Sequence, residues 1–193
     1  MGRAAGTPLG GARTDAQCRF VALLRGVNVG GRTLPMQQLR DLVASLGHTD
    51  VVTYIQSGNV LFGSGRDDRD AIAHEIRAAI DATVGHDVTV VLRTPAELER
   101  VIATNPFADR GDTSPLHVTF LAEPRSAETL ERLDAAARVG DEFHVTDLEI
   151  YVWCPTGYGR TVLTNEFFER RLLVAATTRN WRTVTTLAEM ARG

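Results

Sequence analysis

Apolar positions in the first half of the chain alternate between short β-prone runs and stretches with helical spacing. The runs predict four strands, at residues 20–24, 51–55, 60–62 and 88–92. Helical spacing predicts two helices, at about residues 33–47 and 68–84. Between the second and third strands, Ser57-Gly58-Asn59 is typical of a tight hairpin turn. The order strand, helix, strand, strand, helix, strand is the ferredoxin-like arrangement.

The same order returns after a linking helix. That helix is predicted to begin at Thr94-Pro95-Ala96-Glu97, which has the form of a capping box with proline at the first helical position. The second set of strands is expected at residues 116–121, 143–145, 148–153 and 174–177. Its helices are expected to begin at the caps Ser126 and Thr164, and a last helix begins near Asn180.

The sequence therefore predicts an α+β protein made of two tandem ferredoxin-like (βαββαβ) lobes with antiparallel sheets, a linking helix and a C-terminal helix. The expected division is a flexible N-terminal tail, a first lobe, a linking helix with its loop, and a second lobe with the C-terminal helix, at residues 1–17, 18–93, 94–115 and 116–193.

Three segments place polar groups at the ends of predicted elements, where sites usually lie. They are Leu23–Gly31 (LLRGVNVGG), Thr53–Val60 (TYIQSGNV) and Thr177–Val184 (TTRNWRTV). In this order they resemble the bacterial family called domain of unknown function 1697, whose patterns are LLRGINVGG, TYIQSGNVVF and TxRNWxTVxKL. Val27 replaces the usual isoleucine, and Thr186 stands near the usual lysine. The resemblance implies a two-lobed, ferredoxin-like fold and implies no activity.

The first segment has two interpretations. Backbone N–H groups of Gly30 and Gly31 precede a predicted helix and could hold an anion together with Arg25. The same glycines also suit an ordinary turn between a strand and a helix. The pattern from Gly26 to Gly31 lacks the second glycine of a dinucleotide fingerprint, and a hairpin follows it, so a Rossmann site is not expected.

Amide and arginine side chains of all three segments are candidate ligand contacts. Gln56, Ser57 and Asn59 either line a site or simply build the hairpin turn. Arg179 precedes a helix start, where a positive charge does not favour the helix dipole, and this indicates an anionic partner, either an Asp or Glu elsewhere in the chain or a ligand. The candidate ligand-binding residues are Arg25, Asn28, Gly30, Gly31, Gln56, Ser57, Asn59, Arg179 and Asn180.

The composition excludes several kinds of reaction and binding site. The 21 basic side chains, in a chain of net charge −3, are all arginine, so no Schiff base and no Walker A lysine can be present. Neither the two cysteines, Cys18 and Cys154, nor the five histidines show zinc-ligand spacing, and no metal or cofactor is expected. No apolar run reaches about 18 residues, so we expect no membrane span and a cytoplasmic protein.

Three functions remain open from the sequence. The preferred one is binding of a small anionic or nucleotide-like ligand at a polar site between the lobes. Nucleic-acid binding on a ferredoxin-like sheet is the second, although Phe20 and Phe62 are the only aromatic residues that the first and third strands offer for stacking. The third is a structural or interaction module in which the three segments fix turns and join the lobes. Neither a reaction nor an oligomeric state follows from the sequence.

Overall fold

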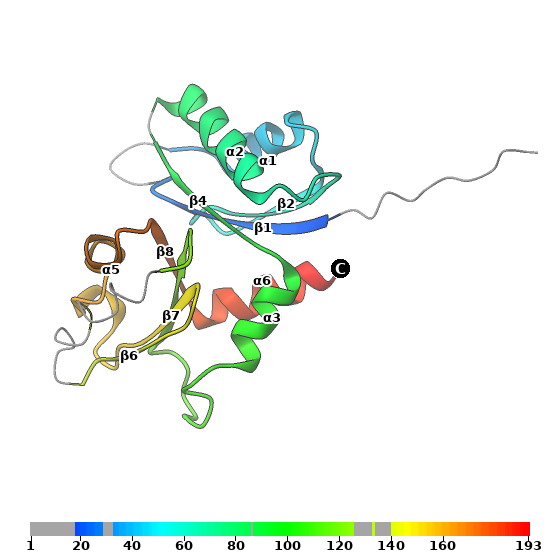
Figure 1. Ribbon diagram of the computed structural model, residues 1–193. Coiled ribbons are helices and arrows are strands. Elements are labelled where there is room, and N and C mark those ends of the chain that lie inside the picture. The colour runs from blue at the N-terminus through cyan, green and yellow to red at the C-terminus, as the bar shows by residue number, and fades with distance from the viewer. Residues whose placement is uncertain (1–17, 29–32, 86, 126–132, 134–139) are drawn as a thin grey trace, which may run out of the picture.

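A computed structural model describes residues 18–28, 33–85, 87–125, 133 and 140–193 (Figure 1). The N-terminal tail, Gly30, Gly31 and the helix expected after Ser126 lie outside the described residues. None of the described helices is long and apolar enough to cross a membrane.

The first lobe has the predicted order of elements. These are β1 (Cys18–Arg25), α1 (Met36–Ser45), β2 (Thr49–Tyr54), β3 (Asn59–Ser64), α2 (Arg69–Val84) and β4 (Thr89–Arg93). The strands form an antiparallel sheet in the order β2-β3-β1-β4, which leaves β2 and β4 at its edges. Helix α2 buries Ile72, Ile76 and Ile80, the apolar positions that repeat every four residues.

The second lobe repeats this topology. Its strands are β5 (Leu116–Leu121), β6 (Glu142–Val145), β7 (Glu149–Trp153) and β8 (Ala176–Asn180), in the sheet order β6-β7-β5-β8. A single turn of 3₁₀ helix, η1 (Tyr158–Arg160), and helix α5 (Asn165–Leu172) follow β7. The fold class expected from the sequence is thus confirmed, with two four-stranded antiparallel sheets.

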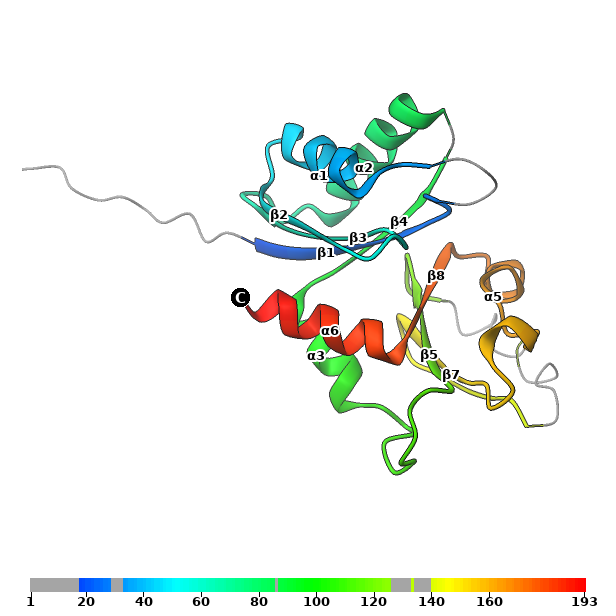
Figure 2. The ribbon, with the colours of Figure 1, turned by 180° about the vertical axis from the view of Figure 1, so that it is seen from behind.

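Two helices lie between the sheets and join the lobes. They are α3 (Pro95–Ala103), which links the lobes, and the C-terminal α6 (Trp181–Arg192) (Figures 1 and 2). One buried cluster includes Val21 and Leu23 of the first sheet, Val118 of the second, Leu98 of α3 and Val184 of α6. On the outer faces, α1 and α2 cover the first sheet and α5 covers the second. The lobes therefore share a core, and burial of its apolar surface favours one relative placement.

Local signals placed most helix ends correctly. The capping box at Thr94 and Glu97 forms in both directions, and Pro95 occupies the first helical position. Asn180 caps α6, since its Oδ1 accepts a 2.8 Å hydrogen bond from the backbone N–H of Thr183.

Several strand ends differ from the expected ones, and two of the differences have a clear cause. The strand expected at residues 174–177 runs from Ala176 to Asn180, because Thr177 and Arg179 pair with Phe120 and Val118 of β5. The strand expected to include Ile55 ends at Tyr54. Ile55 instead begins the turn in a left-handed conformation with a φ of 50°.

Candidate functional site

The three sequence segments meet where the lobes join, and Arg179 lies at their centre. It comes from β8 of the second lobe and is 7% exposed. Its Nε donates a 2.6 Å hydrogen bond to Oδ1 of Asn59, at the start of β3. Its Nη2 donates to the carbonyl oxygens of Leu24, Ser57 and Gly58 at 2.7, 3.3 and 3.2 Å. One side chain thus hydrogen-bonds both other segments.

The partners of Arg179 are neutral oxygens, although the sequence led us to expect a carboxylate or an anionic ligand. Its remaining Nη1 donates within its own strand, to the Thr177 hydroxyl at 2.8 Å and the Thr178 carbonyl at 2.9 Å. Burial lowers the pKa of Arg179 to about 10, so the group still carries its charge at neutral pH. Because each of its three nitrogens has an internal acceptor, the guanidinium acts as a lock between the lobes.

The turn that receives Arg179 is held in shape by its own residues. The Asn59 amide donates to the Tyr54 carbonyl at 3.0 Å and to the Ser57 hydroxyl at 3.1 Å. Gly58 has a φ of 77°, and a Cβ there would lie 3.0 Å from the Cβ of Leu24. Only glycine satisfies both the backbone angle and the close approach. The turn is therefore held in a shape in which the carbonyl oxygens of Ser57 and Gly58 accept hydrogen bonds from Arg179.

Arg25 follows Leu24, whose carbonyl accepts from Arg179, but its own side chain has carboxylate partners. It forms ion pairs with Glu166 and Glu169 of the second lobe, and its contact with Glu166 measures 3.2 Å. Its Nη1 also lies 3.5 Å from the Ala176 carbonyl. A ligand anion would have to displace two carboxylates from Arg25. Binding of an anion by this residue stays a prediction.

The other predicted residues divide between two places. The Asn28 side chain donates a 2.8 Å bond to the Gln56 carbonyl and accepts a 2.7 Å bond from the backbone of Leu34, so it braces the hairpin turn. Asn180 belongs to another surface, at the start of α6, where it lines a groove with Trp181 and Arg182. The structure brings Arg25, Asn28, Gln56, Ser57, Asn59 and Arg179 together and leaves Asn180 apart.

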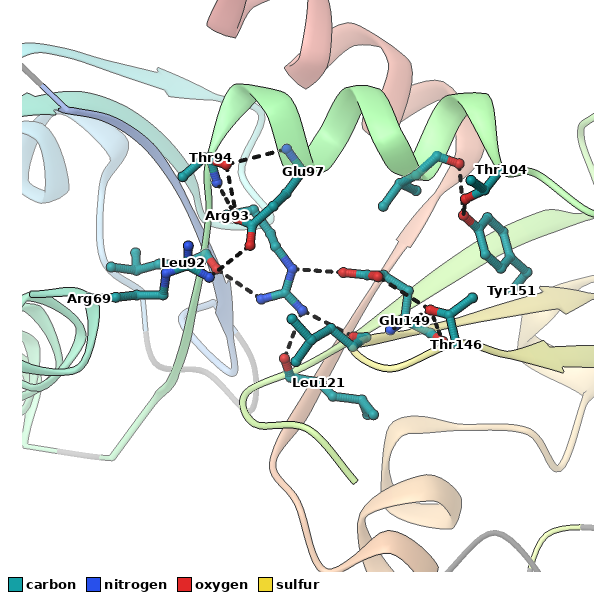
Figure 3. A network of polar contacts seen from close by, with 12 residues as sticks. Arg69, Leu92, Arg93, Thr94, Glu97, Thr104, Leu121, Thr146, Glu149 and Tyr151 are labelled. Atoms are coloured by element: carbon teal, nitrogen blue, oxygen red, sulfur yellow. Dashed lines mark hydrogen bonds and ion pairs between the residues drawn. The ribbon is translucent and has the colours of Figure 1, made fainter. Parts of the chain in front are cut away.

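A second buried arginine, which the sequence analysis did not single out, also joins the lobes. Arg93 at the end of β4 is 1% exposed and pairs with Glu149 of β7 at 2.9 Å (Figure 3). Its Nη2 donates to the carbonyls of Leu121 and Leu148 at 2.8 and 3.0 Å. Burial lowers the pKa of Arg93, while Glu149 opposes that shift. The sequence does contain a signal that could have identified Arg93, because it is a charged residue directly after an apolar predicted strand.

Two possible nucleophiles among the described residues, Cys154 and Ser57, lie in surroundings that do not activate them. Burial raises the pKa of the Cys154 thiol to about 11, so this cysteine stays protonated and unreactive. The Ser57 hydroxyl accepts from Asn59 and has no hydrogen bond to a histidine. No group of three or more His, Cys, Asp or Glu among the described residues could hold a metal ion.

An open groove of about 540 Å³ lies at the junction of the lobes, on the side of α2 and β4. The first lobe contributes residues 89–92 of β4 and the charged side of α2. The second lobe contributes two short segments next to β5 and β8. Besides residues 89–92, the groove is lined by Arg69, Asp70, Ala73, His74, Arg77, Asp87, Ala122, Glu123 and Ala175. The groove could not be predicted from the sequence, because its two walls are at least 30 residues apart in the chain and carry no motif.

Comparisons with known proteins agree with the sequence resemblance. The family model described as "Protein of unknown function (DUF1697)" matches residues 18–151. The solved structure of the conserved bacterial protein SP0830 from Streptococcus pneumoniae is similar over 92% of this chain and all of that chain, with a TM-score of 0.73 and 21% identity. At that identity the likeness concerns the fold. A search of curated proteins found no match.

Proposed function

The chain belongs to the DUF1697 family of unknown function, and from this premise we propose that it is a binding protein whose ligand occupies the groove between the lobes. The observation that carries the proposal is this groove itself, whose walls come from two lobes joined by buried arginines. A volume of about 540 Å³ is within the range typical of ligand sites.

The two arginine locks support a preformed site. Arg179 and Arg93 each connect one sheet to the other lobe through several hydrogen bonds. Sheets fixed in this way hold the groove walls at a constant separation, so a ligand does not have to supply the ordering of the lobes. In this proposal the three sequence segments fix the relative position of the lobes, and residues of α2 and β4 contact the ligand.

The first sheet offers no platform for nucleic acid in the described residues. Phe20 and Phe62, the aromatic residues available for base stacking, are 3% and 1% exposed and lie under α1 and α2. The opposite face of the same sheet packs on α3 and α6. RNA binding by ferredoxin-like sheets needs an exposed aromatic face. The groove therefore supports the binding proposal better than the first sheet does.

Nuclear magnetic resonance of the whole chain tests the proposal. The ¹⁵N-labelled protein is titrated with inorganic phosphate, with ATP, with citrate and with a mixture of random dodecapeptides. At least one probe is expected to shift the backbone amide signals of residues 89–92 and Ala122. The variant Ala122→Trp, which fills the groove, should weaken that binding at least tenfold.

A matched variant separates groove filling from a general effect of tryptophan. Ala78 is exposed on α2 and does not line the groove, so Ala78→Trp should bind as the unaltered chain does. The proposal is wrong if none of the four probes moves the groove signals, or if Ala122→Trp and Ala78→Trp bind equally well.

A further inference from the structure

Strand β4 has one side that no other strand of the described residues occupies. In the part of the chain that the structure describes, it is the terminal strand of its sheet and pairs with β1 alone. Thr89, Val90, Val91 and Leu92 line the groove on its open side. Among the described residues, the backbone of Thr89, Val90 and Val91 makes no hydrogen bond outside the strand pairing.

On an edge strand, alternate residues direct their N–H and C=O groups away from the sheet. Because Leu24 bonds toward β3, the residues of β4 that face the groove in this way are Val90 and Leu92. The Leu92 carbonyl accepts a 2.8 Å bond from Nη1 of Arg93, so both main-chain groups of Val90 and the N–H of Leu92 remain for a partner outside the described residues.

Small side chains leave room beside this edge. Ala73 of α2 faces the groove from the first lobe, and Ala122 and Ala175 face it from the second. A chain in extended conformation can approach alanine closely, whereas larger side chains would block it. The four residues of β4 that line the groove span about 13 Å, at about 3.3 Å per residue.

The charges of the groove select against a free anion. Arg69 pairs with Glu97 at 2.9 Å, and Arg77 pairs with Asp87. Asp70 and Glu123 form no ion pair with the described residues. Counting the lining side chains with His74 neutral, two arginines face three carboxylates, which leaves an excess of one negative charge. A neutral main chain carrying a basic side chain fits this surface better than a phosphate does.

We propose that the groove binds an extended, neutral-to-basic peptide segment, which adds to the sheet as a further strand against β4. This inference rests on the proposed function and names its ligand class. Main-chain hydrogen bonds to β4 supply affinity, and the carboxylates of Asp70 and Glu123 favour a basic side chain.

Selection from a phage-displayed library of random dodecapeptides on the whole chain, with counter-selection on Ala122→Trp, supplies the probes. Enriched peptides are synthesised and their Kd is measured by calorimetry. N-methylation of one alternating set of peptide N–H groups should weaken binding at least tenfold, and methylation of the other set should have little effect. Glu123→Gln should weaken the binding of basic peptides about threefold, and amide signals of residues 89–92 should shift.

Several results would overturn strand addition. One is enrichment of peptides that bind Ala122→Trp as tightly as the unaltered chain. Another is equal tolerance of methylation in both alternating sets. A third is self-association of the chain through β4, detected as a concentration-dependent dimer whose β4 amides are protected. If phosphate, citrate or ATP shifts the groove signals and peptides do not, the binding function stands and the peptide assignment falls.

Discussion

Arg179 shows how one side chain can determine the relation between two lobes. It bonds three carbonyl oxygens and an amide oxygen from the first lobe and two groups of its own strand. A buried cation usually needs a counter-ion, but enough well-oriented neutral oxygens can replace one. Its removal would leave buried acceptors without donors, which costs more than the loss of a single hydrogen bond.

We predict that Arg179→Ala lowers the free energy of unfolding by about 3–5 kcal/mol. Arg179→Lys keeps the charge but lacks the planar fork, so it should recover only a minority of the loss. Urea unfolding followed by circular dichroism measures both. The exposed Arg182→Ala is the matched control and should stay within about 0.5 kcal/mol of the unaltered chain. Equal stability of Arg179→Ala and Arg182→Ala would refute the lock.

Because of His48, the free energy of unfolding is expected to decrease at mildly acidic pH. Its ring is 6% exposed, lies 4.5 Å from the Phe62 ring between centroids, and has an Nε2 without a hydrogen-bond partner. Burial lowers its pKa below the ordinary 6.5, and the nearby Arg66 lowers it further, while Glu75 opposes both. Unfolded His48 therefore binds a proton more readily than folded His48 does.

The chain is accordingly expected to be most stable above pH 6.5 and to lose stability as the pH falls below that value. His48→Gln removes the titration and should flatten the dependence between pH 7 and 5. Because burial also lowers the pKa of His117, a residual slope should remain. Carboxylates with lowered pKa, such as Glu97, act in a separate window below about pH 4.5. Urea midpoints at half-unit pH steps measure the slope, and an unchanged slope in His48→Gln would contradict this assignment.

The hairpin between β2 and β3 contains a residue whose conformation opposes its type. Ile55 has a φ of 50° and a side chain that is 48% exposed, so its β-branch is strained and it packs little. Ile55→Gly should raise the free energy of unfolding by about 0.5–1 kcal/mol, since relief of strain exceeds the added entropy of the unfolded chain. Ile55→Val keeps the β-branch and should show no gain. A loss of stability in Ile55→Gly would mean that the side chain contributes contacts that outweigh the strain.

Elements with a strong local signal were predictable from the sequence. The isoleucines of α2 and the capping box of α3 fix those helices through spacing and hydrogen bonding within a few residues. The end of β2 and the extent of β8 were less accessible. Ile55 has the β propensity of a strand residue, yet it lies in a turn whose shape depends on Gly58 and Asn59. Thr178 and Arg179 resemble a loop before a helix, yet they pair with β5.

Part of the candidate site could be predicted from the sequence. Arginine and amide side chains at element ends indicated segments that do contact one another, since Arg179 bonds Asn59 and the Leu24 carbonyl. Ligand binding by these residues stays a prediction. Their partners could not be deduced, because Leu24, Gly58 and Ala176 contribute main-chain oxygens, which every residue has. The groove walls come from segments that become neighbours only through the docking of the lobes.

The molecule as a whole is two similar lobes that share one layer of helices. Helices α3 and α6 bury residues against both sheets (Figure 1). Arg179 and Arg93, both buried, each hydrogen-bond the other lobe, and Figure 3 shows the contacts of Arg93. A shared core and two buried locks couple the folding of the lobes, so we predict that neither lobe unfolds alone. The groove keeps its shape for the same reason.

Native-state hydrogen exchange tests this coupling most directly. In the unaltered chain, the slowest amides of β1 and β3 should report the same free energy of opening as those of β5 and β7. In Arg179→Ala the free energy of opening should decrease by the same amount in all four strands. If one sheet exchanges at a free energy several kcal/mol below the other in the unaltered chain, the lobes are independent and the account of the arginine lock is wrong.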